Sequence, residues 1–222
     1  MSIAIALDGP AGAGKSSIAK RAAKALNFIY VDTGALYRTV GLAASRNGVQ
    51  PENTEKIEEL LSKIKVELTF NEKGEQIVLL DGEDVSGLIR TPEASMMASK
   101  ISAVPIVRAY LLDLQRDMAK THDVIMDGRD IGTVVLPNAK VKIFLTASPE
   151  ARAQRRYKEL VEKGMDVKYE DILSDVITRD YQDSHREIAP LKPADGSVLV
   201  DTTELDFEQS IEKIISVIKE NS

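Results

Sequence analysis

Short apolar runs alternate along the chain with longer segments in which apolar residues recur every three or four positions. The runs predict buried β-strands at residues 3–7, 28–31, 123–126, 141–145 and 198–201. The longer segments have the period of amphipathic helices, as Ile57, Leu60 and Ile64 do. Strands that alternate with helices across tight links are typical of a doubly wound α/β fold, here with a five-stranded parallel sheet.

The same periodicity indicates which residues these helices bury. Helices are expected at 17–26, from 35, at 104–120, from 148 and at 169–184. In the C-terminal helix the residues expected on the buried face are Phe207, Ile211, Ile214, Ile215 and Ile218.

One segment breaks the strand–helix alternation. Residues 66–70 and 76–80 alternate in polarity around a turn at 71–74, which predicts a β-hairpin with one dry face. Thr91 and Pro92 then fit the capping and first positions of a helix. We therefore expect an inserted, β-rich subdomain at about residues 62–102, within a single domain that spans residues 1–222.

The first strand and the first helix are joined by Gly9-Pro10-Ala11-Gly12-Ala13-Gly14-Lys15-Ser16, which fits the phosphate-loop pattern Gly-x4-Gly-Lys-Ser/Thr. Glycines let backbone N–H groups curl around phosphate oxygens, and the helix N-terminus adds the positive end of its dipole. Lys15 would reach the β- and γ-phosphates, and the Ser16 hydroxyl would bind magnesium. The alternative is a glycine-rich turn that only joins a strand to a helix.

Composition narrows the possible partners. The 222 residues carry a net charge of −6, which argues against a broad nucleic-acid or anionic-membrane surface. There is no cysteine and there are two histidines, so disulfides, thiolate metal sites and histidine-rich metal sites are excluded. No stretch approaches the ~20 apolar residues of a membrane span, and we expect a cytoplasmic protein.

Two polar clusters follow predicted strands, where ligands collect in this class of fold. Asp32-Thr33-Gly34-Ala35-Leu36-Tyr37-Arg38 places an arginine fork in the opening turn of a helix. Asp127-Gly128-Arg129-Asp130 places an acid where phosphate-loop proteins bind magnesium or its water shell. Taken alone, Arg38 is better explained as an exposed helix residue and Tyr37 as a packing aromatic. The second cluster could be ordinary loop chemistry, but beside a phosphate loop it favours function.

Arginines are also grouped in the second half of the chain. Arg152, Arg155 and Arg156 lie three and four apart, and Arg179 and Arg186 follow. In a net-acidic protein this grouping indicates a bound anion, although a solvated basic stripe would explain any single member. Phosphate loops serve ATPases, GTPases and small-molecule kinases alike. The chain lacks the guanine-reading Asn-Lys-x-Asp motif, so ATP is the expected donor.

Taken together, these motifs resemble those of bacterial cytidylate kinases nearly from end to end. The matching stretches are residues 9–16, 32–38, 81–86, 89–93, 127–135 and 179–190. The resemblance implies direct in-line transfer of the ATP γ-phosphoryl group to CMP or dCMP, with Mg²⁺ and no covalent intermediate. It also implies a short lid at about residues 152–168.

The resemblance carries over to individual positions of this sequence. ATP would be held by residues Gly9 to Ser17, with Ser17 completing the loop, and by Arg152, stacked on adenine. CMP would be held by Thr33, Tyr37, Arg38, Ser99, Arg108, Arg129, Asp130, Arg179, Asp183 and Arg186. Catalysis would rest on Lys15, Arg38, Arg129, Arg156 and Arg179. Magnesium would be held by Ser16 and by Asp127, directly or through water.

Physical chemistry is consistent with these assignments. A carboxylate such as Asp130 accepts from the N4 amino group of cytosine, and an arginine such as Arg108 donates to its acceptors. The second pKa of the acceptor phosphate is about 6, so no catalytic base is required.

Two other readings stay open at this point. One is a different nucleoside monophosphate kinase. The other is a nucleotide-dependent sensor that contacts a protein partner through the hairpin at 66–80. For the kinase we expect a monomer whose partners are CMP, dCMP and ATP, with no nucleic acid and no membrane.

Overall fold

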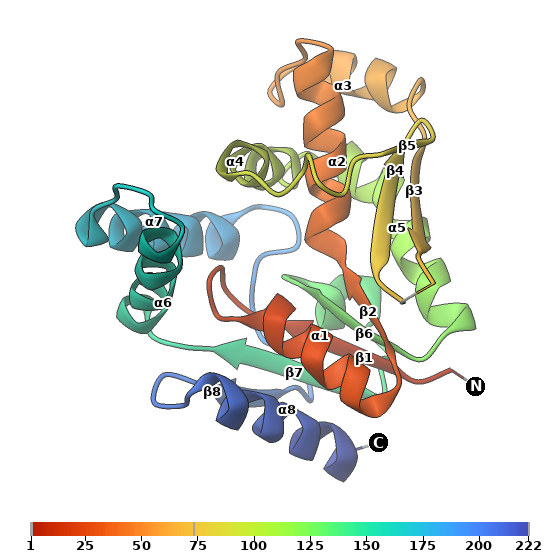
Figure 1. Ribbon diagram of the computed structural model, residues 1–222. Coiled ribbons are helices and arrows are strands. Elements are labelled where there is room, and N and C mark those ends of the chain that lie inside the picture. Colours follow the sequence, from red (N-terminus) through yellow and green to blue (C-terminus); the bar gives the residue numbers. More distant parts are fainter. Residues whose placement is uncertain (1, 73, 222) are drawn as a thin grey trace.

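A five-stranded parallel sheet forms the centre of the computed structural model, which describes residues 2–72 and 74–221 (Figure 1). The strand order is β2-β6-β1-β7-β8, with β1 in the middle. The strands are β1 (Ala4–Asp8), β2 (Ile29–Asp32), β6 (Val124–Gly128), β7 (Val141–Thr146) and β8 (Val198–Asp201). The prediction of a five-stranded parallel α/β sheet is therefore confirmed.

The register of the sheet brings three strand ends to one edge. In the β1–β6 pair Asp8 lies opposite Gly128, and in the β2–β6 pair Asp32 lies opposite Asp127. The carboxyl ends of parallel strands meet at the same edge, and ligands bind there in open α/β sheets. Both polar clusters and the phosphate loop consequently meet at a single place.

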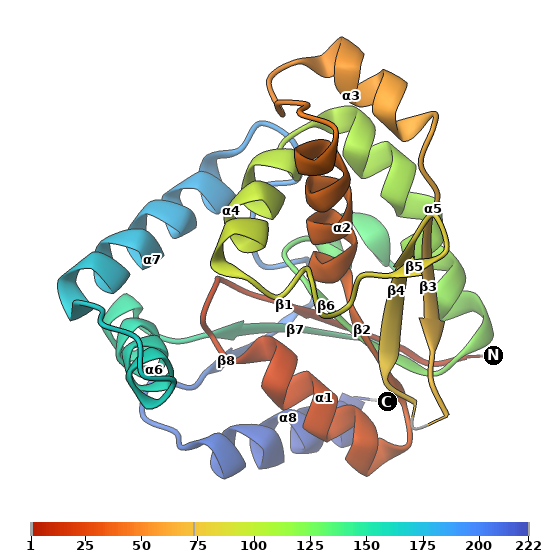
Figure 2. The same cartoon turned by 45° about the horizontal axis from the view of Figure 1, so that its top comes forward.

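Helices cover both faces of the sheet. On one face α1 (Lys15–Leu26) and α8 (Phe207–Asn221) lie side by side (Figures 1 and 2). Their Ile18 and Ile214 pack with Leu7 and Ile143 of the sheet. On the other face α2 (Thr33–Arg46) and α5 (Pro105–Thr121) pack over the sheet. Burying apolar side chains on both faces of the strands is typical of a doubly wound sheet.

The prediction that Phe207 is buried is wrong. Phe207 is the first residue of α8 and is 45% exposed, because it lies at the rim of the cleft described below. Ile211, Ile214 and Ile218 are buried as expected, and Ile215 is half-buried.

The predicted hairpin is confirmed and gains a third strand. β3 (Val66–Phe70), β4 (Gln76–Leu80) and β5 (Glu83–Asp84) form an antiparallel sheet. The predicted turn at 71–74 includes residue 73, which lies outside the described residues, but Asn71 N–H donates to Glu75 O across it at 3.0 Å.

The dry face of this small sheet belongs to the main core. Leu68, Val78 and Leu80 are buried in the same apolar cluster as α2, α5 and one face of the central sheet. In the sequence, the small sheet lies between α3 (Thr54–Leu61) and α4 (Pro92–Ile101), and α4 packs along α2. The inserted segment therefore packs against α2, which begins at the carboxyl edge of the central sheet.

Two helices that follow the carboxyl end of β7 pack against each other. α6 (Pro149–Glu162) begins as predicted, with Ser148 Oγ accepting from Ala151 N–H at 3.1 Å. It pairs with α7 (Tyr169–His185) through a small apolar cluster that includes Leu160 and Ile172 (Figure 2). Within the described residues, no helix is long and apolar enough to cross a membrane.

Close packing leaves no room for a side chain at the first glycine of the phosphate loop. Gly9 has φ +151°, and an added Cβ would lie 1.9 Å from the main-chain oxygen of Leu145 on β7. We expect Gly9→Ala to lower the free energy of unfolding by more than about 3 kcal/mol, measured by urea denaturation.

The matched control is Gly87→Ala. An added Cβ there meets nothing within 4 Å, so the variant should unfold like the parent. Equal unfolding midpoints for both variants would contradict the steric role of Gly9.

Candidate active site

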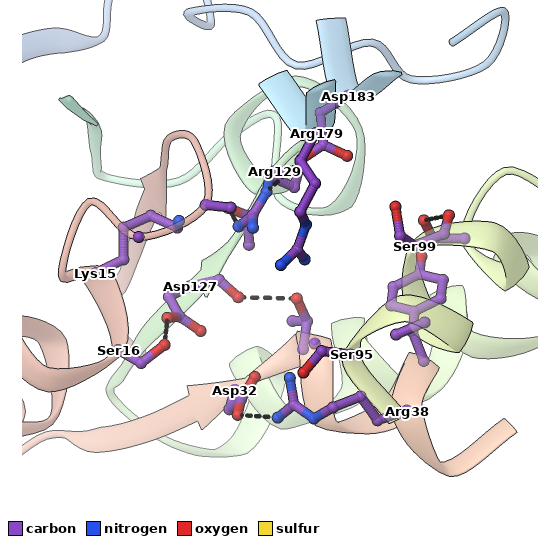
Figure 3. Close-up of a pocket in the computed structure, with 18 of the residues that line it drawn as sticks. Lys15, Ser16, Asp32, Arg38, Ser95, Ser99, Asp127, Arg129, Arg179 and Asp183 are labelled. Atoms are coloured by element: carbon purple, nitrogen blue, oxygen red, sulfur yellow. Dashed lines mark hydrogen bonds and ion pairs between the residues drawn. The ribbon is translucent and has the colours of Figure 1, made fainter. Parts of the chain in front are cut away.

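A cleft of about 580 Å³ lies at the carboxyl edge of the sheet, between the phosphate loop, α2, α4 and α7 (Figure 3). Most of the residues predicted for the site line it together: Ala11, Gly12, Gly14, Lys15, Ser16, Ser17, Thr33, Tyr37, Arg38, Ser99, Arg108, Asp127, Arg129, Asp130, Arg156, Arg179, Asp183 and Arg186. Figure 3 shows Arg179 extending from α7 into the cleft, with Lys15 on one side and Ser99 on the other. The cleft therefore unites motifs that lie far apart in the sequence.

The phosphate loop ends in an uncapped helix. α1 begins at Lys15, two residues earlier than predicted, after Gly14 in the left-handed region with φ 84°. No side chain caps its N-terminus, and its first turn holds no acidic residue. The free N–H groups and the helix dipole thus favour an anion at this position.

Lys15 is buried within the loop itself. Its Nζ donates to Pro10 O at 2.8 Å, and 5% of the residue is exposed. Burial lowers the pKa of Lys15 to about 7, and the positive charge of Arg129 adds to this against the attraction of Asp127. A bound phosphate would favour the charged form of the amine, since a nearby opposite charge raises the pKa of a lysine.

Ser16 and Asp127 form the candidate metal pair. Ser16 Oγ donates to Asp127 Oδ2 at 2.7 Å (Figure 3). Burial raises the pKa of Asp127 to about 6, helped by the neighbouring Asp32 carboxylate. No cluster of three or more acidic, histidine or cysteine ligands occurs in residues 2–72 and 74–221. Two oxygen donors fit Mg²⁺, which is usually held by one or two carboxylates together with waters and substrate phosphates.

Asp32 is a site residue that the sequence analysis did not single out. One oxygen, Oδ1, caps α2 by accepting from Ala35 N–H at 3.0 Å, and Oδ2 pairs with Arg38 Nη2 at 2.7 Å. The buried Nε of Arg38 has no hydrogen-bond partner. An aspartate directly before a helix is a recognisable capping signal, so its role was open to prediction.

Thr33, which directly follows β2, links the carboxyl ends of β2 and β6. Its Oγ1 donates to the main-chain oxygen of Asp127 at 2.8 Å. An added Cβ on Gly128 would lie 2.8 Å from this hydroxyl oxygen, so the glycine makes the contact possible.

A buried ion pair lies deeper in the cleft. Arg108 Nη2 donates to Asp130 Oδ2, and both residues are less than 10% exposed. Arg186 Nη2 lies 3.8 Å from the other Asp130 oxygen and has no hydrogen-bond partner. The Arg108 guanidinium also lies 5.6 Å from the ring centroid of Tyr37. Arg108 and Asp130, the residues predicted to read the base, thus lie next to Arg186 and Tyr37.

Two further arginines, Arg129 and Arg179, line the cleft with the phosphate loop. Arg129 Nε donates to Asp183 Oδ2 at 2.9 Å. Burial lowers the pKa of Arg179, and the like charge of Arg129 adds to this. Cations held this close together gain from an anion placed between them.

Arg152 does not line the cleft with its neighbours. Its buried guanidinium donates to Ala147 O and Ala11 O, both at 2.8 Å, and pairs with the Asp180 carboxylate. A buried guanidinium needs such partners, and here they hold it behind the phosphate loop. The stacking of Arg152 on adenine stays a prediction. Pro10 and Arg152 border a second, more open cavity of about 470 Å³ on that side.

Asp8 is a second residue whose role the sequence analysis missed. Its two carboxylate oxygens accept from Ile131 N–H and Gly132 N–H, each at 2.7 Å. These residues begin an unpredicted π-helix, η1 (Ile131–Val135), which directly follows Asp130. The signal in the sequence that could have indicated this role is an acidic residue at the end of an apolar strand. Asp8 thereby anchors the loop that carries Arg129 and Asp130.

A phosphate-binding loop that faces a second cluster of arginines across one cleft defines a phosphate-loop kinase, with one place for a donor and one for an acceptor anion. Residues 5–220 match the family described as cytidylate kinase. The chain belongs to the cytidylate kinase family, and the resemblance noted in the sequence is confirmed.

Individual relatives agree over nearly the whole chain. The cytidylate kinase of Thermosipho melanesiensis is 51% identical over 97% of this chain and 96% of the relative. That of Caldicellulosiruptor bescii is 48% identical over 97% and 95%. A crystal structure of an uncharacterized protein from Eubacterium ventriosum covers 99% of each chain with a TM-score of 0.54 at 13% identity, which supports the fold alone.

The environment of Asp8 predicts a pH dependence of stability. Burial raises its pKa from 3.8 to about 6 despite its two backbone hydrogen bonds. The folded state therefore binds the proton more tightly than the unfolded state, and stability falls as pH rises between these two values. Relative to Asp8→Asn, which cannot ionise, the parent should lose about 2–3 kcal/mol of unfolding free energy between about pH 4 and 7.

Urea denaturation of both proteins across that range measures the difference. The comparison cancels contributions that the two proteins share. A difference that stays constant with pH would contradict the raised pKa of Asp8.

Proposed function

We propose that this protein transfers the γ-phosphoryl group of ATP to CMP and dCMP, giving CDP and dCDP. Transfer is direct and in line, with Mg²⁺ and without a covalent intermediate. Membership of the cytidylate kinase family supports this reaction. The observation that carries it is the buried Arg108–Asp130 pair, which lies in the same cleft as the phosphate loop.

The phosphate loop is the donor site in this proposal. Backbone N–H groups from Gly9 to Ser17 hold the triphosphate, and Lys15 turns from Pro10 O to the β- and γ-phosphates. Ser16 and Asp127 would hold the metal, Asp127 directly or through water, and their oxygen donors suit it. When bound, Mg²⁺ neutralises the charge that develops on the phosphates.

The acceptor phosphate would lie among Thr33, Arg38 and Arg129, with Tyr37 packed beside it. The unpartnered Nε of Arg38 supports this, because a buried donor without a partner costs about 1–3 kcal/mol and a phosphate oxygen would satisfy it. Asp183, already paired with Arg129, would contact the ribose together with Arg179.

The base would be read by Asp130 and Arg108, with Ser99 and Arg186 beside them. The N4 amino group of cytosine donates to Asp130, and its O2 and N3 accept from arginine. Uracil presents a carbonyl in place of the amino group, so its oxygen would face the Asp130 carboxylate. Such a mispaired buried group costs about 1–3 kcal/mol, which is enough for a clear preference.

Catalysis would consist of alignment and charge cancellation. The acceptor phosphate is largely ionised at neutral pH, since its second pKa is about 6, and needs no general base. Lys15, Arg38, Arg129, Arg156 and Arg179 cancel charge between two polyanions. Closure of the lid at residues 152–168 and of the insertion at 62–102 would exclude water and so prevent hydrolysis of ATP.

The proposal extends to the working state of the protein. We place it in the cytoplasm as a monomer that acts on small molecules. A sensor that contacts a partner through the hairpin at 66–80 is disfavoured, because the arginines of the cleft would then have no second anion to bind.

An assay of ADP release across CMP, dCMP, UMP, AMP and dTMP tests the proposed reaction. We expect the highest kcat/KM with CMP and dCMP, with UMP lower by about tenfold or more. Turnover with AMP or dTMP and none with CMP would overturn the proposal. Stable capture of a partner, without transfer to any monophosphate, would favour the sensor.

Asp130→Ala tests the reading of the base. We expect kcat/KM for CMP to fall by about tenfold to a hundredfold and that for UMP to fall much less, since Asp130 favours only cytosine. Asp113→Ala, an exposed change on α5, is the control. Equal losses for CMP and UMP would remove Asp130 from base recognition.

A further inference from the structure

The side chain of Gln76 joins the inserted sheet to the end of the central sheet. Its Oε1 accepts from Asp32 N–H at 2.8 Å, and its Nε2 donates to Asp32 O at 3.1 Å. Gln76 is the first residue of β4, and Asp32 is the last residue of β2. One side-chain amide therefore satisfies both main-chain groups of a single residue.

The position of β2 explains why such a contact matters. β2 is the edge strand of the five-stranded sheet, and an edge strand presents unpaired N–H and C=O groups. A side-chain amide carries the same donor and acceptor as a peptide group. Gln76 thus adds one rung of hydrogen bonding to the edge of the sheet without a further strand. A carboxylate would lack the donor, and an apolar side chain would lack both groups.

Asp32 passes this constraint on to the cleft. Gln76 holds the main chain of Asp32, while the Asp32 carboxylate pairs with Arg38 Nη2 at 2.7 Å (Figure 3). Arg38 lines the cleft with a buried, unpartnered Nε, whereas Gln76 does not line it. A continuous set of hydrogen bonds therefore connects the inserted sheet to the arginine that faces the acceptor site.

Other contacts of the hairpin with the main body are weaker or lie elsewhere. Lys20 Nζ pairs with Glu75 Oε1 at 3.2 Å, and both side chains are at least half exposed. An exposed pair of this kind contributes about 0–1 kcal/mol. The packing of α4 along α2 lies away from Asp32, with Met97 against Gly41. The amide of Gln76 instead forms hydrogen bonds with the last residue of β2 itself.

We propose that Gln76 is a positioning residue for the acceptor. Its amide fixes the main chain of Asp32, and through the Asp32–Arg38 pair it sets the orientation of the Arg38 guanidinium. The insertion thereby determines the affinity for the nucleoside monophosphate without touching it. This inference rests on the proposed role of Arg38 in binding the acceptor phosphate.

Two substitutions at one site test the inference. Gln76→Leu removes both hydrogen bonds, and Gln76→Glu keeps the acceptor oxygen but replaces the donor. We expect Gln76→Leu to raise the KM for CMP by about tenfold, and Gln76→Glu by a comparable factor, with the KM for ATP within about twofold of the parent. The matched controls are Gln50→Leu and Gln50→Glu, since Gln50 is exposed on the loop before α3. An unchanged KM for CMP in both Gln76 variants would overturn the inference.

A double-mutant cycle with Arg38→Ala distinguishes positioning from a merely structural role. If Gln76 acts through Arg38, Gln76→Leu should change the KM for CMP by less than about twofold once Arg38 is absent. Full additivity of the two losses would overturn the inference. An Arg38→Ala protein with the parental KM for CMP would instead refute the proposed role of Arg38 itself.

Amide hydrogen exchange provides a second readout that does not depend on activity. In the parent, Asp32 N–H should be protected by the Gln76 oxygen, although it lies on an edge strand. Gln76→Glu keeps this acceptor and should keep the protection, even if Gln76→Leu folds poorly. Rapid exchange at Asp32 in the parent would overturn the inference.

Discussion

The parallel pairing of β1 and β2 with β6 is the constraint on which the rest of the molecule depends. Because side-by-side parallel strands end at one edge, Asp8, Asp32 and Asp127 come together although more than ninety positions separate the first two from the last. Each aspartate then does a separate task. Asp8 anchors the η1 segment, Asp32 caps α2, and Asp127 holds Ser16.

Burying so many charged side chains at one edge of the sheet costs free energy. Ion pairs and hydrogen bonds within the site offset part of this cost. Asp130 pairs with Arg108, and Asp183 pairs with Arg129. Lys15 donates a hydrogen bond to the main-chain oxygen of Pro10 in its own loop. The raised pKa of Asp127 and the lowered pKa of Lys15 both arise first from burial. A bound phosphate would stabilise the charged form of Lys15, and a divalent cation would stabilise the charged form of Asp127. The ligands would thus supply the charge compensation that pairing within the site leaves incomplete.

The insertion is coupled to this edge by packing and by polar contacts. The dry face of its sheet completes the core beneath α2, and α4 lies along the same helix. Gln76 adds a directional contact at Asp32, whose carboxylate pairs with Arg38. Apolar packing fixes where the insertion lies, whereas the amide fixes the register of one residue, because hydrogen bonds are directional and burial is not.

Local pattern alone determined the strand–helix alternation, the hairpin and the phosphate loop, since these depend on periodicity, turn residues and glycine spacing within about twenty positions. Motif resemblance also indicated most of the cleft-lining residues. Only the tertiary structure decided the roles of Asp8 and Gln76, because their partners lie far away in the sequence. The capping of α2 by Asp32 was open to prediction, whereas its contact with Gln76 was not. The tertiary structure likewise placed Arg152 behind the phosphate loop and Phe207 at the rim of the cleft. Periodicity predicts which face of a helix or strand is buried. The fold determines which polar group forms a hydrogen bond with a buried polar side chain.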